Sequence, residues 1–148
     1  MLIVMFKTVI TLLVAFVTWP VEAENYRMIT VEKLPQAARE LLVNHFPHQE
    51  ISYAAAERSL FERSYKVYLA DGSTIEFDRN GTWYEIDCHG GVVPPVLIPK
   101  PIREQVALRF PAMEVEQIER LKKGYKVELR EGPELKFDAR YRLVYIDD

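Results

Sequence analysis

Cysteine is almost absent from this 148-residue chain, in which Cys88 is the only one. A single cysteine cannot form an internal disulfide, so the hydrophobic core must hold the fold together even in an oxidising compartment. Basic clusters are also lacking, and the formal net charge is −3, which argues against a nucleic-acid partner. The sequence shows no catalytic triad, zinc-ligand spacing or phosphate-binding loop. These absences favour a binding or structural role over catalysis.

A long apolar run is missing as well. The N-terminal apolar segment is interrupted by Lys7 and ends at Trp19-Pro20, short of the ~20 residues that a membrane-spanning helix needs. Compact residues then precede Glu24, as in a secretory signal peptide, so we expect cleavage between Ala23 and Glu24 and export to the periplasm or the exterior. A membrane anchor is the alternative interpretation of this segment.

The sequence contains an internal repeat. Residues 65–72 (YKVYLADG) return as residues 125–132 (YKVELREG), sixty positions later. Upstream, Phe46-Pro47 matches Phe110-Pro111 at an offset of sixty-four, so one copy is longer by four residues somewhere in 54–64. This self-similarity predicts two copies of a unit of roughly 50 residues.

Each copy begins with a helical pattern and continues with strands. The helices are expected from Leu34-Pro35 to Phe46 and from Ile98-Pro99 to Phe110, since proline is tolerated in a first turn and Pro47 and Pro111 stop the pattern. After each helix the apolar period changes to two, and Asp71-Gly72 is typical of a tight hairpin turn.

We therefore predict an α+β fold of two tandem repeats, each one helix followed by a four-stranded antiparallel meander, with the helices packed on one face of the sheet. Phe77 and Phe137 are expected to be equivalent core residues of the two copies. The predicted organisation is a signal peptide (1–23), repeat 1 (28–89), a stiff connector (90–97) and repeat 2 (98–148).

The repeated pattern resembles the PepSY-like, beta-lactamase-inhibitor-like family of secreted bacterial proteins. Both copies carry a helix ending in Phe-Pro, then Tyr-Lys-Val-x-Leu-x-Asp/Glu-Gly, Phe-Asp and Ile-Asp, and residues 80–83 (NGTW) add a match in the first. The resemblance covers residues 28–148. It implies tandem helix-plus-sheet units, secretion and a non-enzymatic role in binding or inhibiting other proteins. No fixed motif defines functional residues in this family, so none is carried over.

Titratable residues do not form a convincing chemical site. His45, His48, His89 and Cys88 lack the spacing of a zinc-ligand set, and Cys88 and His89 are adjacent in an extended segment, so their side chains point apart. The repeated aspartates lie at strand ends, where a carboxylate satisfies turn amides. They are Asp78, Asp87, Asp138 and Asp147. We predict no catalytic residue, no metal site and no cofactor.

The sheet face away from the helices carries the candidate site. Strand alternation places Tyr68 and Trp83 on that face, opposite Val67, Leu69, Tyr84 and Ile86. Aromatic residues among alternating charges are typical of a protein-binding surface. The candidate protein-binding residues are Lys66, Tyr68, Glu76, Trp83, Lys126, Glu128, Lys136 and Tyr145. Alternatively, the two sheets bury this face against each other, or its exposed aromatics have no role.

The sequence favours a periplasmic or secreted, non-enzymatic protein-binding module, with inhibition of a hydrolase or peptidase as one form of that role. The partner is expected to be another protein of unknown identity, with no nucleic acid and no stable membrane span after signal cleavage. An envelope-associated structural protein that self-assembles through its sheet edges is the first alternative, and a small secreted enzyme is the second.

Overall fold

The structure is a computed structural model that describes residues 26–58 and 62–148. The predicted signal peptide, 1–23, lies outside the described residues. The elements follow one another as β1 (Tyr26–Ile29), a 3-10 turn (Val31–Lys33), α1 (Gln36–His45), β2 (Ile51–Arg58), β3 (Arg63–Leu69), β4 (Thr74–Phe77), β5 (Trp83–Asp87), a second 3-10 turn (Pro95–Leu97), α2 (Lys100–Arg109), β6 (Val115–Leu121), β7 (Gly124–Leu129), β8 (Glu134–Asp138) and β9 (Leu143–Asp147).

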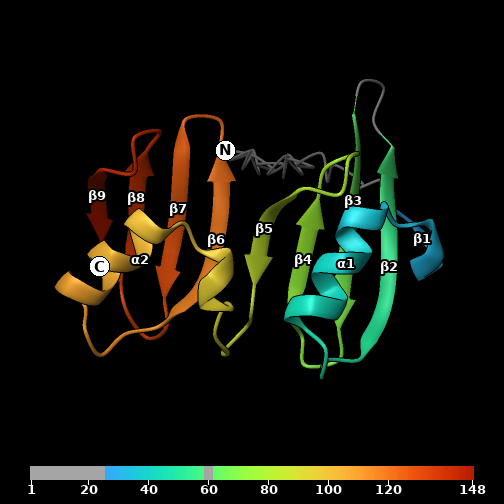
Figure 1. The fold of residues 1–148 in the computed structure, drawn as a ribbon, viewed down its shortest axis with the longest axis horizontal. Coiled ribbons are helices and arrows are strands. Elements are labelled where there is room, and N and C mark those ends of the chain that lie inside the picture. The colour runs from blue at the N-terminus through green and yellow to red at the C-terminus, as the bar shows by residue number, and fades with distance from the viewer. Residues whose placement is uncertain (1–25, 59–61) are drawn as a thin grey trace, which may run out of the picture.

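The strands form one antiparallel sheet of nine strands in the order β1 to β9 (Figure 1). The predicted fold class, two tandem repeats with a four-stranded meander each, is therefore wrong. The sheet continues through β5 and β6, where Ile86 lies opposite Ile118. This pairing satisfies the backbone groups that two separate sheets would leave unpaired at these edges. The prediction also omitted β1, which pairs with β2.

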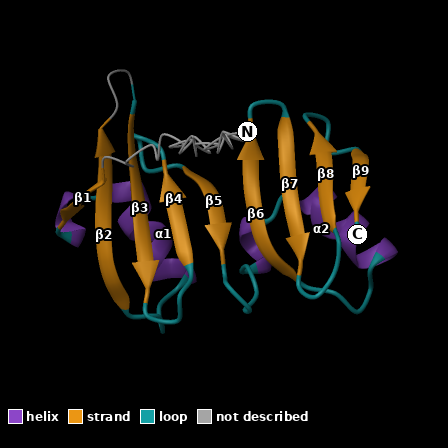
Figure 2. Ribbon diagram, turned by 180° about the vertical axis from the view of Figure 1, so that it is seen from behind, coloured by secondary structure: helices purple, strands orange, loops and turns teal. Residues whose placement is uncertain are grey.

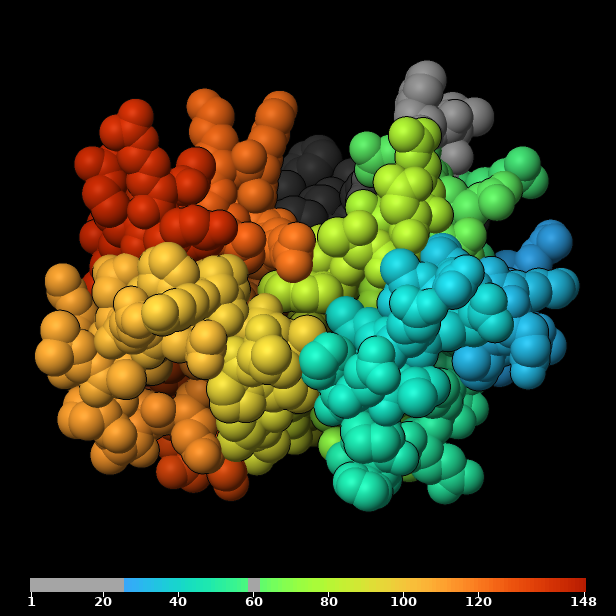
Figure 3. Space-filling view, viewed as in Figure 1, coloured from blue at the N-terminus to red at the C-terminus, as the bar shows by residue number. Residues whose placement is uncertain are grey.

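In the described part of the chain, both helices lie on the same side of the sheet, and no helix covers the opposite side, which we call the open face (Figure 2). Figure 3, seen from the helix side, shows the segments of α1 and α2 covering much of the sheet. One hydrophobic cluster runs beneath them and includes residues from both halves of the chain, such as Ile86, Ile118 and Val127. Phe77 and Phe137 are both buried in it, which confirms their predicted position.

Two prolines mark the ends of α1, because Pro35 occupies its N-cap position and Pro47 follows its last turn. Ala38 and Leu42 are buried on its inner side. The turn after β4 packs closely under its first residues: a Cβ added to Gly81 (φ +81°) would lie 2.8 Å from Cβ of Pro35. The corresponding turn before β9 has a tyrosine, Tyr141, in the left-handed region at φ 60°.

The segment between β5 and α2 is packed against the sheet. Val93 is fully buried and its N–H donates to the carbonyl of Val115, while the N–H of Cys88 donates to the carbonyl of Glu116. These bonds tie the connection to β6, so they stabilise the junction between β5 and β6 together with the strand pairing.

Candidate protein-binding face

The open face of the sheet is crossed by one row of directly paired residues, which we call the charged row. Strand register places each member opposite the next, so their side chains stand on the same face. From β3 to β9 the row reads Lys66, Glu76, Glu85, Glu119, Lys126, Lys136 and Tyr145. Three carboxylates thus occupy the centre of the face, with cations on both sides of them.

A hydrogen-bonded triad forms the first part of the row. Lys66 Nζ lies 2.6 Å from Glu76 Oε1, and the Tyr84 hydroxyl donates to Glu76 Oε2 at 2.7 Å. Partial burial lowers the pKa of Lys66, but the hydrogen bond and charge of Glu76 outweigh it and raise that pKa overall. Burial, followed by the bond to Glu76, raises the pKa of Tyr84 far above its ordinary value. Lys66 therefore stays charged and Tyr84 neutral across the physiological range.

The centre of the row brings like charges together. Glu85 lies directly opposite Glu119 across the β5–β6 junction and opposite Glu76 on its other side. Burial raises the pKa of Glu85, and the charges of Glu76 and Glu119 raise it further. Gln117 Nε2 donates to Glu85 Oε1 at 2.7 Å, and Lys126 Nζ lies 3.2 Å from Glu119 Oε2. These two contacts offset part of the repulsion.

Lysines organise the second half of the row. Lys126 Nζ also lies 3.6 Å from Glu128. Burial lowers the pKa of Lys126, but the bond to Glu119 and the charges of Glu119, Glu128 and Glu134 together outweigh it and raise that pKa overall. Lys136 Nζ lies 3.3 Å from Glu134 and 5.1 Å from the centre of the Tyr145 ring. Tyr145 is 47% exposed, so its ring is available at the outer end of the row.

A tyrosine pair lies beside the first part of the row. The rings of Tyr53 and Tyr68 stack with their centroids 4.1 Å apart, and Lys66 Nζ lies 5.5 Å from the Tyr68 ring. Tyr53 is 41% exposed. A stacked pair held by a cation offers a broad aromatic surface whose side chains are already ordered.

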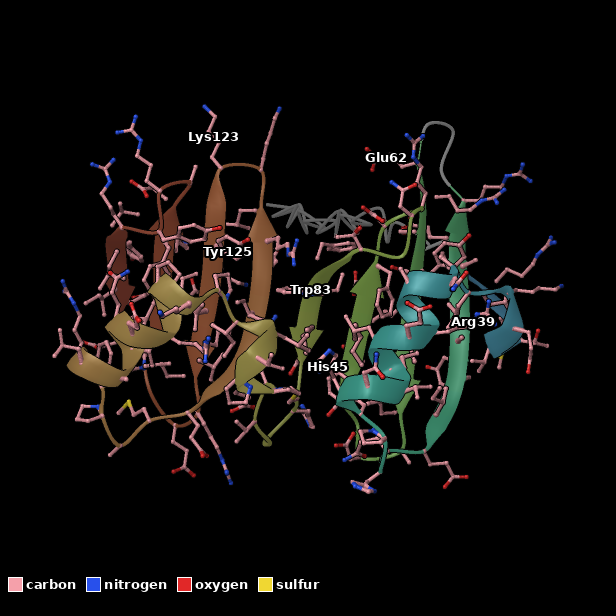
Figure 4. The ribbon with its side chains drawn as sticks, in the orientation of Figure 1. Arg39, His45, Glu62, Trp83, Lys123 and Tyr125 are labelled. Atoms are coloured by element: carbon pink, nitrogen blue, oxygen red, sulfur yellow. The ribbon has the colours of Figure 1, made fainter. Side chains whose placement is uncertain are left out.

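Seven of the eight candidate residues lie on this face, and their role in binding stays a prediction. The eighth, Trp83, does not: it is 5% exposed, belongs to the hydrophobic core and lies on β5 beside β6 (Figure 4). The guanidinium of Arg120 lies 4.0 Å from the centre of its ring. The predicted position of Trp83 on the open face is wrong.

A β-bulge explains this error. Phe77 pairs with Trp83 while its neighbour Glu76 pairs with Glu85, so Tyr84 is the extra residue of β5. Strict alternation placed Tyr84 in the core, yet its hydroxyl reaches Glu76 on the open face. Sequence reasoning also missed several other residues of this face, namely Tyr53, Glu85, Gln117 and Glu119. Their strands were predicted, but the pairing of β5 with β6, which brings Glu85 and Glu119 together, was not.

Other titratable groups are bound up in turns or buried. Asp78 Oδ1 accepts the N–H groups of Asn80 and Thr82. Burial, with the charges of Asp71 and Asp87 adding to it, raises the pKa of the buried Cys88 thiol to about 11, so it is not activated as a nucleophile. Within residues 26–58 and 62–148, no group of three or more His, Cys, Asp or Glu side chains is arranged to hold a metal ion.

Comparison with known proteins places these observations in a family. Residues 63–144 match the family described as "Putative beta-lactamase-inhibitor-like, PepSY-like". A putative periplasmic protein of the DUF2874 family from Bacteroides vulgatus is 36% identical, with a TM-score of 0.82 over 85% of this chain and 99% of that one. A putative calcium-regulated periplasmic protein from Bacteroides thetaiotaomicron is also 36% identical, with a TM-score of 0.81 over 85% and 99% of the two chains.

A second putative periplasmic protein from Bacteroides vulgatus, of unknown function, is 37% identical, with a TM-score of 0.78 over 83% of this chain and 99% of that one. The search of curated proteins finds no match. In the described part of the chain, no helix has both the length and the apolar character needed to cross a membrane.

Proposed function

The chain belongs to the PepSY-like family, and on that premise we propose that it is a non-enzymatic module that binds another protein through its open sheet face. The protein is periplasmic or secreted, in keeping with the description of its solved relatives. The single observation that carries the proposal is the charged row with its tyrosines, an ordered surface that spans the sheet from β3 to β9.

Preorganisation supports a binding role for this face. Most of the charged side chains in the row are held by a neighbour, as Lys66 is by Glu76 and Lys126 by Glu119. A partner that docks on them freezes few additional rotamers, so less of the contact energy is offset by lost entropy. Surface ion pairs contribute little to folding stability, typically about 0–1 kcal/mol each. A role in recognition therefore explains the ordered ion pairs of this face better than their small contribution to folding stability does.

The tyrosines are the expected anchors of the interface. Tyrosine offers large contact area with few rotors, and such residues dominate many binding energies. Tyr53 with Tyr68 lies near one end of the face and Tyr145 near the other. Charge sets the orientation between them, since a complementary partner presents cations opposite the central carboxylates and anions opposite the flanking lysines.

The partner class follows from the family description. The family is described as beta-lactamase-inhibitor-like, and we extend that description to this chain by proposing that its partner is a hydrolase or peptidase of the cell envelope. The open face would cover the partner's substrate cleft. Inhibition through a broad sheet surface requires no reactive group, in agreement with the raised pKa of Cys88.

Affinity capture tests the proposal. The exported protein is immobilised and challenged with cell-envelope extract, and the captured protein is identified and assayed for hydrolase or peptidase activity with and without the module. The double variant Tyr53→Ala/Tyr68→Ala should weaken the dissociation constant for that partner about 30-fold or more, which is the effect of losing ~2 kcal/mol at a hot spot.

The matched control changes exposed residues on the helix side. Val43 on α1 and Leu108 on α2 are both exposed, so Val43→Ala/Leu108→Ala should leave affinity unchanged. Capture that survives the tyrosine double variant, or that is lost equally in the helix variant, would show that the open face is not the binding surface. Capture without any change in the partner's activity would retain the binding role and reject inhibition.

A further inference from the structure

The last strand, β9, leaves an apolar edge uncovered. It pairs with β8 on one side, and no strand within the described residues pairs with its other side. Val144 is 62% exposed and Ile146 is 44% exposed, and Tyr145 stands between them. The edge therefore combines free backbone groups with three large side chains, a combination that favours pairing with a further strand.

The equivalent positions in β5 show what this edge can bind. Residues 83–87 (WYEID) lie sixty positions before residues 143–147 (LVYID), and both strands share the bulged pairing with the strand before them. Ile86 is fully buried because β6 pairs along the outer side of β5 and places Ile118 opposite it. Ile146 occupies the position of Ile86 without such a neighbour. An antiparallel strand with an apolar residue in register would bury Ile146 in the same way.

We propose that the outer edge of β9 pairs antiparallel with β9 of a second copy of this chain. A two-fold axis normal to the sheet makes the two edges antiparallel, which is the orientation of all eight existing pairings. The register with Ile146 opposite Ile146 of the second copy repeats the Ile86–Ile118 pairing at the β5–β6 junction.

Charge along the strand supports a second copy as the occupant. Arg140 and Arg142 come immediately before β9, whereas Asp147 and Asp148 stand at its end. With Ile146 opposite Ile146, antiparallel pairing places Asp148 opposite Val144 of the second copy and two positions from its Arg142, twice by symmetry. Arg142 also contacts Asp138 of its own copy, with its Nε 2.7 Å from Oδ2. Parallel pairing would instead place like charges side by side, so the charge pattern favours the antiparallel arrangement.

The opposite edge of the sheet is less suited to the same pairing. Strand β1 has only four residues (YRMI), and one of them, Arg27, is a charged and exposed residue. A two-fold pairing of β1 with itself would bring two such cations together, which protects an edge against self-association. Of the two edge strands in the described part of the chain, β9 therefore carries the proposal.

Dimerisation would extend the open face across both copies. The helices of the two copies stay on one side of the joined sheet, and Tyr145 lies close to the symmetry axis on the other side. The proposal does not depend on what the open face binds, so its failure leaves the protein-binding proposal intact.

Sedimentation equilibrium of the exported protein across roughly 1 to 300 µM tests the pairing, because a dimer whose dissociation constant lies in this range changes its average mass with concentration. We expect a monomer–dimer equilibrium. Val144→Lys and Ile146→Lys should each weaken dimerisation at least tenfold while the thermal unfolding of Val144→Lys stays close to that of the parent. Met28→Lys, at an exposed position on β1, should leave the dimer unchanged.

Cross-linking tests the register. Ile146→Cys should form a disulfide-linked dimer on mild oxidation, whereas Leu108→Cys on α2 should not; the native Cys88 is buried and should not contribute. A protein that is monomeric throughout the concentration range would overturn the proposal. A dimer that survives both lysine variants on β9 would overturn it as well, since its interface must then lie elsewhere.

Discussion

Replacing Trp83 by alanine separates the observed structure from the position that alternation predicts for this residue. If Trp83 stood on the open face, its removal would weaken binding and leave folding intact. The side chain is instead 5% exposed within the core, at the junction where β5 meets β6. Trp83→Ala should therefore reduce the free energy of unfolding, and any loss of binding should follow from the loss of folded protein.

The magnitude follows from burial and from one specific contact. Removing a buried tryptophan costs about 3–5 kcal/mol through lost transfer free energy and the remaining cavity. The guanidinium of Arg120 lies 4.0 Å from the centre of the ring, and such a contact at an exposed arginine is worth about 0.5–1 kcal/mol. We expect a total near 4–5 kcal/mol, a large part of the ~5–15 kcal/mol typical of whole domains.

Urea unfolding followed by circular dichroism measures this change, with the slope checked for two-state behaviour. The midpoint of thermal unfolding should fall by roughly 12–20 °C for a domain of this size. Arg120→Met keeps most of the aliphatic stem and removes only the charge, so it should cost about 0.5–1 kcal/mol. A loss below ~1 kcal/mol for Trp83→Ala, together with a folded protein that no longer captures its partner, would show that the strand phase assigned to β5 is wrong.

Two further predictions concern the turn under α1 and the buried thiol. Gly81→Ala should reduce the free energy of unfolding in urea by at least ~2 kcal/mol, because Gly81 has φ +81° and a Cβ there would lie 2.8 Å from Cβ of Pro35 and 2.9 Å from the backbone nitrogen of Ala38. Gly90→Ala is the control: Gly90 has φ +83° with nothing within 4 Å of an added Cβ, so its loss should be only about 1 kcal/mol. Equal losses in the two variants would refute the packing argument. Burial raises the pKa of Cys88 from 9.0 to about 11, so the folded state favours the protonated thiol. The resulting contribution to the free energy of unfolding is complete below pH 9.0 and is lost as the pH rises to about 11. Across that window the parent should lose stability relative to Cys88→Ala, and parallel pH profiles of the two proteins would contradict the burial of the thiol.

Local signals in the sequence predicted the individual elements. The proline pairs Leu34-Pro35 and Phe46-Pro47 bracket α1, which spans Gln36–His45, because proline is compatible only with the first turn of a helix. Asp71-Gly72 marks the turn between β3 and β4, and Gly72 has φ 91° there, which glycine adopts at little cost. Such signals depend on a few neighbouring residues, so a single sequence contains them.

Long-range pairing was not predictable in the same way. Alternation shows which side of a strand is buried, but it does not show which strand lies beside it. The pairing of β5 with β6 connects residues such as Ile86 and Ile118 across a helix and a connector, and the similarity between the two halves suggested separate units instead. Strand β1 was missed because its four residues carry little alternation, and its pairing with β2 is also remote in sequence.

The candidate face was predictable wherever strands alternate regularly, as for Lys66 and Glu76 or Lys126 and Lys136. The prediction of the face failed at β5, where the bulge inserts Tyr84 and shifts Trp83 into the core. A signal was present, since Trp83 and Ile86 are three residues apart, and an odd spacing between two apolar strand residues indicates an inserted residue. Leu143 and Ile146 show the same spacing in β9, which has the corresponding bulge.

The centre of the open face departs from an ordinary rule of strand pairing over three consecutive positions. Like charges directly opposite each other destabilise a sheet, yet Glu76, Glu85 and Glu119 stand in consecutive positions of one row across the β5–β6 junction. The burial of Ile86, Ile118 and the connector on the other side holds this junction together. Departures from local consistency are expected at functional sites, where stability is exchanged for recognition. The joined sheet thus makes the acidic centre possible, because two separate sheets would never bring Glu85 opposite Glu119.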